Sequence, residues 1–130
     1  NVYMSARSHH HILVIEDRID FAQYTMMALE RYEFRAHHAA DGQAALEYIQ
    51  EHRPSAVLLD LNLPDTSGWQ VLEEMKAKYG TIPVVVTTAY SDSANRVVGK
   101  LQDVYRYVVK PFSPQEIVAI VDEALGIKEH

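Results

Sequence analysis

Polar side chains that could handle a charged group stand directly after four short apolar segments of the sequence. They are Glu16, Asp17, Asp60, Thr88 and Lys110. Carboxylates that crowd together cannot all stay ionised without a positive partner. Oxygen ligands favour Mg²⁺ or Mn²⁺ over zinc, and a lysine and a hydroxyl beside such an ion suit a phosphoryl group. These residue types therefore predict phosphoryl chemistry at a divalent cation.

The elements that must position these residues are indicated by an alternation of apolar and amphipathic segments. The apolar segments are rich in valine, isoleucine and leucine, which is typical of parallel strands covered on both faces. We expect strands at 12–15, 34–38, 56–61, 82–86 and 107–109, and helices at 20–31, 41–51, 67–79, 92–101 and 113–125. The helix at 92–101 should be the least firmly packed, because Gly99 interrupts its small apolar face.

Five strands alternating with five helices predict an α/β fold with a doubly wound, five-stranded parallel sheet of order 2-1-3-4-5, as in flavodoxin-like proteins. Strands one and three are neighbours in this order, so the three carboxylates should converge at one edge. Ligands of such sheets bind at the carboxyl ends of the strands, where the strand order reverses. The predicted fold therefore brings the candidate residues to the expected ligand site.

The composition indicates one domain in the cytoplasm. The 130 residues are 48% hydrophobic, carry a net charge of −6 and include no cysteine. The negative charge argues against binding a nucleic acid backbone or a membrane, and the lack of cysteine excludes thiol catalysis and disulfides. We expect a leader at 1–10 that is disordered or foreign to the protein, a domain at 11–126 and a tail at 127–130.

Several motifs together resemble the receiver domain of two-component response regulators, a family of phosphoproteins in phosphorelay signal transduction. The resemblance covers about 11–125, and it is specific because the motifs occur together at their usual spacings. They are Ile-Leu-Val-Ile-Glu-Asp (12–17), Ala-Asp-Gly-Gln-Ala-Ala-Leu (40–46), Leu-Leu-Asp-Leu-Asn-Leu-Pro-Asp-Thr-Ser-Gly (58–68), Val-Thr-Thr-Ala-Tyr (86–90) and Tyr-Val-Val-Lys-Pro-Phe (107–112).

The resemblance implies that Asp60 accepts a phosphoryl group from the phosphohistidine of a histidine kinase or phosphotransfer protein. It implies that Glu16 and Asp17 organise Mg²⁺, Asp17 directly and Glu16 through water. Asn62 would lend its backbone carbonyl to the metal. The first acidic position holds Glu16 where aspartate is commoner, a departure within the family's range.

The resemblance also implies how the signal is passed on. Thr88 and Lys110 would contact the phosphoryl oxygens, and the bond before Pro111 would be cis. Thr88 and Tyr107 would form a switch that alters the face at 92–125, which would bind an output protein, an attached output domain or a second copy. Such a domain modifies its own aspartate and turns over no diffusing substrate, so we do not expect an enzyme.

Three other functions remain as alternatives. A hydrolase of the haloacid dehalogenase type needs a second acid where Asn62 stands, and a flavin binder needs a phosphate loop after the first strand. A receiver-like scaffold would bind partners without phosphorylation. The histidines at 9–11 and 37–38 are expected to be packed or solvated, without a metal-binding role.

Overall fold

The computed structural model describes residues 5–89 and 104–128. Five parallel strands form one sheet of order β2-β1-β3-β4-β5, as the sequence predicted. The helix expected at 92–101 lies outside the described residues. The described elements are η1 (Ala6–His9), β1 (His11–Ile15), α1 (Ile19–Arg31), β2 (Arg35–Ala39), α2 (Gly42–Glu51), β3 (Ala56–Asp60), α3 (Gly68–Tyr79), β4 (Val84–Thr88), β5 (Arg106–Val109) and α5 (Pro114–Leu125).

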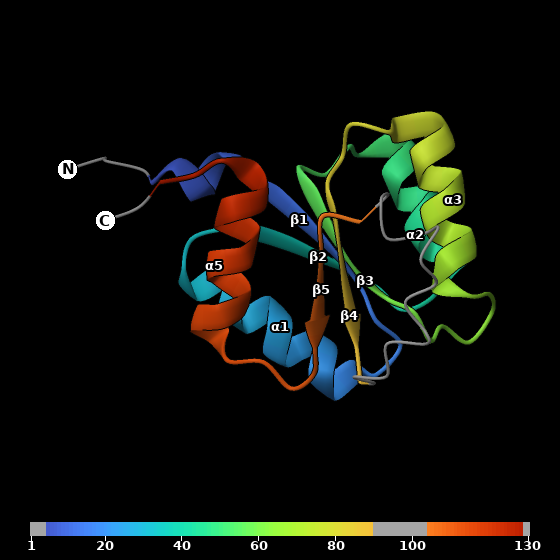
Figure 1. Cartoon of the computed structure of the whole chain (residues 1–130), viewed down its shortest axis with the longest axis horizontal. Helices are drawn as coiled ribbons and strands as arrows, with labels where there is room; N and C mark the ends of the chain where they lie inside the picture. The colour runs from blue at the N-terminus through green and yellow to red at the C-terminus, as the bar shows by residue number, and fades with distance from the viewer. Residues whose placement is uncertain (1–4, 90–103, 129–130) are drawn as a thin grey trace.

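The helices cover the sheet from both sides. Helices α1 and α5 lie on one face, and α2 and α3 lie on the other (Figure 1). Alternate residues of each central strand pack into two different hydrophobic clusters, one on each face of the sheet. In β1, Ile12 and Val14 join the cluster under α1 and α5, whereas Leu13 and Ile15 join the cluster under α2 and α3. This burial on both faces explains the continuous apolar segments.

Helix boundaries follow the capping signals in the sequence. The side chains of Asp41, Ser67 and Ser113 accept hydrogen bonds from backbone N–H groups in the first turns of α2, α3 and α5. Gly126 ends α5 in the left-handed conformation that favours glycine. Strand β4 begins at Val84, two residues later than predicted, because Pro83 has no N–H for the ladder.

The segment expected as a leader, either disordered or foreign to the protein, contains a short helix. Ala6–His9 form the short 3₁₀ helix η1. The Arg7 guanidinium makes two hydrogen bonds to the Asp122 carboxylate of α5, at 2.9 and 2.7 Å. It also lies 5.8 Å from the centre of the Tyr32 ring and 5.9 Å from that of Phe34. The polar composition of this segment does not indicate the contact, because its hydrogen-bond partner, Asp122, is more than a hundred positions away in the sequence.

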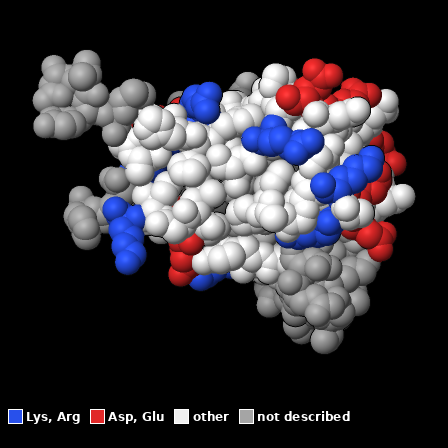
Figure 2. Space-filling model, turned by 90° about the horizontal axis from the view of Figure 1, so that it is seen from above, with Lys and Arg blue, Asp and Glu red and all other residues white. Residues whose placement is uncertain are grey.

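The surface carries both signs of charge. In the view from above, acidic side chains gather at the end of the molecule formed by α2 and α3, with basic side chains beside them (Figure 2). Within residues 5–89 and 104–128, no helix is long and apolar enough to cross a bilayer.

Candidate functional site

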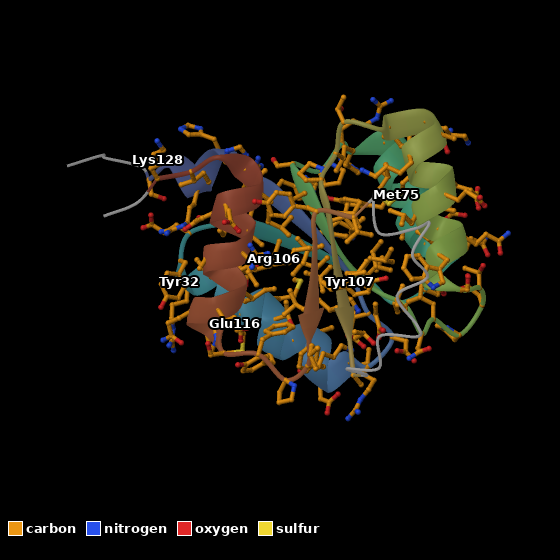
Figure 3. All side chains as sticks on the ribbon, in the orientation of Figure 1. Tyr32, Met75, Arg106, Tyr107, Glu116 and Lys128 are labelled. Carbon is orange, nitrogen blue, oxygen red and sulfur yellow. The ribbon has the colours of Figure 1, made fainter. Side chains whose placement is uncertain are left out.

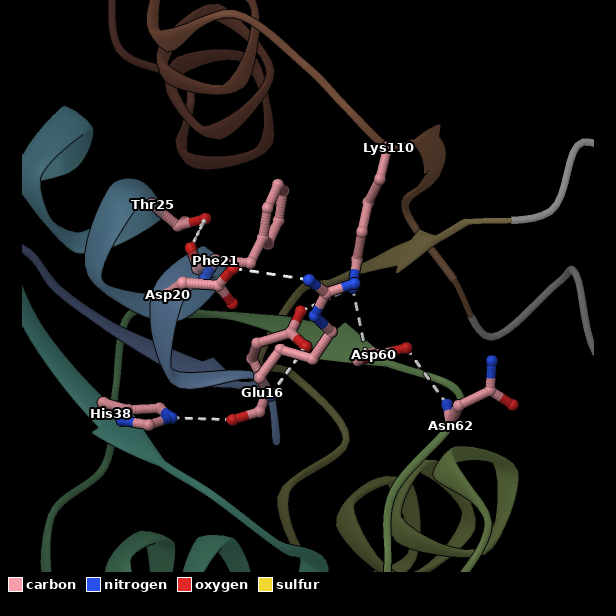
Figure 4. Close-up of polar contacts among 9 residues, drawn as sticks. Glu16, Asp20, Phe21, Thr25, His38, Asp60, Asn62 and Lys110 are labelled. Carbon is pink, nitrogen blue, oxygen red and sulfur yellow. Dashed lines mark hydrogen bonds and ion pairs between the residues drawn. The ribbon is translucent and has the colours of Figure 1, made fainter.

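The candidate residues stand at the carboxyl ends of neighbouring strands. Glu16 directly follows β1, Asp60 and Thr88 are the last residues of β3 and β4, and Lys110 directly follows β5. The register pairs Ile15 with Leu59 and Asp60 with Thr87, so the strand ends are level. Figure 4 shows Glu16, Asp60 and Lys110 converging at the ends of the strands.

Three carboxylates form the acidic part of the site. Glu16, Asp17 and Asp60 each contribute an oxygen, and these oxygens lie within 4.8 Å of one another. Glu16 and Asp60 are buried, whereas Asp17 is exposed. A cavity of about 450 Å³ opens beside them and is lined by Asp17, Asp60, Lys110 and other residues. The acidic group is therefore accessible from solvent on the Asp17 side.

The Lys110 ammonium lies between two of the carboxylates. Its Nζ donates hydrogen bonds to Glu16 Oε1 at 2.6 Å and to Asp60 Oδ2 at 3.1 Å. The same nitrogen lies 4.7 Å from the centre of the Phe21 ring. The Lys110 N–H donates to the Thr88 carbonyl at 2.7 Å, and the Lys110–Pro111 peptide bond is cis, as the resemblance implied.

Glu16 is the most enclosed of the acids. Its second oxygen accepts a hydrogen bond from the Arg18 N–H at 3.2 Å. Burial raises the pKa of Glu16 above its ordinary value; the Lys110 ammonium opposes this shift, and the Asp60 charge adds to it. With all three acids ionised and Lys110 protonated, the group would carry a charge of −2. Hard oxygen donors with that surplus fit one divalent cation such as Mg²⁺.

The Asp60 carboxylate is held at both oxygens. Oδ1 accepts a hydrogen bond from the Asn62 N–H at 3.0 Å, and Oδ2 accepts the bond from Lys110. The chain then folds back closely, since the Gly68 N–H donates to the Leu61 carbonyl at 2.9 Å. A Cβ on Gly68 would lie 2.7 Å from the Asp60 carbonyl oxygen, so only glycine fits there without movement.

The structure also places the remaining predicted residues, Thr88, Tyr107 and Asn62. Thr88 is buried at the end of β4. Tyr107 is half-buried on the α3 side of β5, where its ring centre lies 6.1 Å from that of Trp69. Arg106 points to the other side of β5 (Figure 3). The backbone N–H of Asn62 bonds Asp60, and the role of the Asn62 backbone carbonyl as a metal ligand stays a prediction.

Two residues near the site were given no role there by the sequence analysis, which considered His38 only as a possible metal ligand and Phe21 not at all. Phe21 lies against the Lys110 ammonium, and the His38 Nε2 lies 2.6 Å from the Glu16 carbonyl oxygen. Their positions did carry a signal. Phe21 stands in the first turn of the helix that leaves the site, and His38 is near the end of the strand next to β1. Neither residue belongs to a quoted motif, so only the topology could have indicated them.

Comparison with known proteins decides the family. The family described as "Response regulator receiver domain" matches residues 12–122. This chain belongs to the response regulator receiver domain family. Receiver domains are components of two-component signalling. The acidic group of Glu16, Asp17 and Asp60 is consistent with the phosphoacceptor and metal site of this family.

Relatives of this receiver domain include longer proteins. The transcriptional regulatory protein SrrA of Staphylococcus aureus is 38% identical over 114 residues, which cover 88% of this chain and 47% of SrrA. The chain thus spans about half the length of the curated relatives it matches.

Solved structures show the same fold. A CheY-like receiver domain protein from Methanospirillum hungatei JF-1 has a TM-score of 0.84 at 24% identity, covering 90% of this chain and 94% of that chain. NtrX from Brucella abortus in complex with ATP has a TM-score of 0.84 at 25% identity, covering 90% of this receiver domain and 27% of NtrX.

Proposed function

We propose that Asp60 accepts a phosphoryl group from the phosphohistidine of a histidine kinase or phosphotransfer protein. The observation that carries this proposal is the position of the Asp60 carboxylate. It lies beside an open acidic cavity, with the Asn62 N–H on one oxygen and the Lys110 ammonium on the other. This arrangement fixes the direction of a nucleophile and places a positive charge beside it.

In the proposed reaction, an Asp60 oxygen attacks phosphorus in line with the bond to the donor imidazole. The new O–P bond forms as the P–N bond breaks, and the imidazole leaves with the electron pair of that bond. Lys110 would move its hydrogen bond from Asp60 to a phosphoryl oxygen, and the Thr88 hydroxyl would donate to another. The product is an aspartyl phosphate, so the protein modifies itself and is not a classical enzyme.

The proposal includes a divalent cation. Asp17, Asp60 and the backbone carbonyl of Asn62 would hold Mg²⁺ or Mn²⁺ directly, with Glu16 acting through water. The ion would supply positive charge to offset the oxygens of the transferred group. Since Glu16 is already bonded to Lys110, an indirect role for Glu16 agrees with its contacts.

Mass spectrometry of the intact protein tests this proposal. Incubation with Mg²⁺ and a small acyl phosphate should add one phosphoryl group, and Asp60→Asn should abolish the product. Glu73→Gln is the matched control, because Glu73 is an exposed carboxylate of α3 that does not line the cavity, and it should still be labelled. Labelling of Asp60→Asn would refute the assignment. An unlabelled wild-type protein would instead favour a scaffold that binds partners without phosphorylation.

The output side of the proposal concerns Thr88, Tyr107 and the face at 92–125. Phosphorylation would draw the Thr88 hydroxyl inward and allow Tyr107 to change position, altering β5 and α5 for an output protein, an attached output domain or a second copy in the cytoplasm. Residues 92–103 of this face lie outside the described part. If Tyr107→Ala left partner binding as sensitive to phosphorylation as the wild type, the switch proposal would fail.

A further inference from the structure

The loop between β3 and α3 is attached to a helix that lies outside the phosphoacceptor site. Asp65 belongs to this loop. Its Oδ1 accepts a hydrogen bond from the Gly42 N–H at 2.9 Å, and its Oδ2 accepts one from the Gln43 N–H at 3.0 Å. Both donors are free N–H groups of the first turn of α2, which carry the positive end of the helix dipole. Asp65 therefore fastens the loop to the start of α2 through a charged, two-bond contact.

Helix α2 has a second cap that does not involve the loop. The Asp41 side chain accepts a hydrogen bond from the Ala44 N–H at 2.8 Å. Asp41 and Asp65 thus satisfy different N–H groups of the same helix end. Loss of either should weaken α2, but only loss of Asp65 should release the loop. The chain therefore contains its own control for the effect of the loop.

The loop itself is closely folded. Asn62 and Ser67 form an antiparallel bridge, and the Gly68 N–H bonds the Leu61 carbonyl. A Cβ on Gly42 would lie 2.5 Å from the Thr66 methyl carbon, so α2 and the loop are in close contact. Since the loop is braced at its base and against α2, movement of Asp65 should be passed to its other residues.

The other side of the loop reaches the phosphoacceptor. Three residues before Asp65, the Asn62 N–H donates to Asp60 Oδ1 at 3.0 Å. We propose that Asp65 is a positioning residue, which holds the loop on α2 and so keeps the Asn62 amide on Asp60 and the Asn62 carbonyl directed for the cation. The carbonyl part of this inference rests on the proposed function.

The charge of Asp65 suits this role. The Gly42 N–H, followed by that of Gln43, lowers the pKa of Asp65 below its ordinary value, so the carboxylate accepts both bonds throughout the neutral range. Asparagine at this position has one carbonyl oxygen and could retain only one of the two bonds. Asp65→Asn should therefore have an effect between those of the wild type and Asp65→Ala.

The experiment compares the wild type with Asp65→Ala, Asp65→Asn and Asp41→Ala. The exchange rate of the Asn62 amide proton, measured by NMR without metal, reports directly on its bond to Asp60. Mg²⁺ affinity is measured separately by Trp69 fluorescence, and Tm by thermal unfolding. Asp65→Ala should speed exchange of the Asn62 amide proton. It should also weaken Mg²⁺ binding roughly tenfold, which is the lower end of the loss in affinity seen when a residue that supports a metal ligand is replaced. Asp41→Ala should lower Tm while Asn62 exchange and Mg²⁺ affinity stay at the wild-type values.

The inference is overturned if Asp65→Ala matches the wild type, or if Asp41→Ala changes Asn62 exchange and Mg²⁺ affinity as much as Asp65→Ala does. Asp65→Asn keeps the test decisive if the alanine variant does not fold, because it should still speed Asn62 exchange. Failure of the proposed function would look different. The wild-type protein would then take up no phosphoryl group, whereas the exchange of the Asn62 amide would still report on Asp65.

Discussion

The Lys110 ammonium lies 2.6 Å from the Glu16 carboxylate, closer than its 3.1 Å contact with Asp60. Glu16 is buried, and the Lys110 side chain is 12% exposed. The lysine is therefore anchored on an acid that the proposed reaction does not modify. It can lose its contact with Asp60 during phosphorylation and still remain at the site.

Lys110→Ala should leave the buried acids without their ammonium partner. We expect the free energy of unfolding to fall by about 3 kcal/mol at neutral pH, because breaking a buried ion pair leaves an uncompensated charge. Mg²⁺ should then raise Tm more in Lys110→Ala than in the wild type, since the cation would replace the missing charge. Urea unfolding measures the first effect, and thermal unfolding with and without Mg²⁺ measures the second. Lys78→Ala, on the exposed side of α3, is the control, and an equal response in both variants would contradict the prediction.

Two arginine–carboxylate pairs at α5 should differ in their contribution to stability. Arg7 and Asp122 are 13% and 14% exposed, and their contact has two hydrogen bonds. Arg106 and Glu123 make a 2.6 Å contact but are 46% and 54% exposed. Exposed pairs contribute about 0–1 kcal/mol, whereas enclosed two-bond pairs contribute more. Arg7→Ala should therefore lower the free energy of unfolding by about 2 kcal/mol, more than Arg106→Ala does.

Chemical denaturation of both arginine variants checks this order. Arg7→Lys should recover little of the loss, because lysine lacks the planar fork that makes two parallel bonds. The prediction is wrong if Arg106→Ala lowers the free energy of unfolding as much as Arg7→Ala does.

Gly68→Ala should disturb the turn after Asp60. The added Cβ would lie 2.7 Å from both the Asp60 carbonyl oxygen and the Leu61 Cα, and these backbone atoms cannot rotate away. We expect a loss of about 1–3 kcal/mol in the free energy of unfolding, the usual effect of overpacking. Gly80→Ala is the control, because Gly80 has a helical conformation and its added Cβ would lie 3.1 Å from the Lys76 carbonyl oxygen, a less severe approach. A loss of similar size there would count against this explanation.

Acidification should destabilise the contact of α2 with β1 and β2 through its histidines. The His11 Nε2 lies 2.6 Å from the Tyr48 hydroxyl oxygen, within hydrogen-bond distance. The His37 ring stacks on the Tyr48 ring with 3.9 Å between the ring centres, and the His52 ring also stacks on Tyr48. Burial lowers the pKa of His11 and of His37 below 6.5. Repulsion from Arg35, His37 and His52 adds to the shift at His11, and repulsion from His38 and His52 adds to it at His37.

The unfolded chain therefore binds more protons than the folded chain once the pH falls below about 6.5, and stability falls with it. The fall in Tm between about pH 7.5 and about pH 5.5 should be smaller in His37→Gln than in the wild type. His9→Gln, an exposed change on η1, should keep the wild-type difference. Identical pH profiles for the wild type and His37→Gln would refute this explanation.

Local signals predicted most of the fold because they act within a few residues. The capping spacing of Ser113 and Glu116, and the glycine at 126, depend only on nearby backbone groups. The docking of η1 could not be predicted in the same way, since Arg7 has its partner on α5. The strand order could be predicted because crossovers between parallel strands are right-handed and because polar residues follow four of the predicted strands. Neither argument requires knowledge of side-chain contacts.

The sequence could predict that the candidate residues converge, but it could not predict which side chains bond one another. Residue types after each strand indicated Glu16, Asp60 and Lys110, because parallel strands must end at one edge. Which acid holds the lysine depends on side-chain length and burial, and neither is visible in the sequence. The same limit applies to Asp65, whose bonds to α2 depend on how closely the loop approaches Gly42.

The alternation of buried residues along β1 and β3 separates two cores with little side-chain contact through the sheet. Substitutions in different cores should have additive effects on stability, as expected for sites without shared neighbours. The core beneath α1 and α5 could therefore be repacked in evolution while the packing beneath α2 and α3 stays unaltered. Phe21 would have to be kept on that side, because its ring also contacts the Lys110 ammonium at the acidic group.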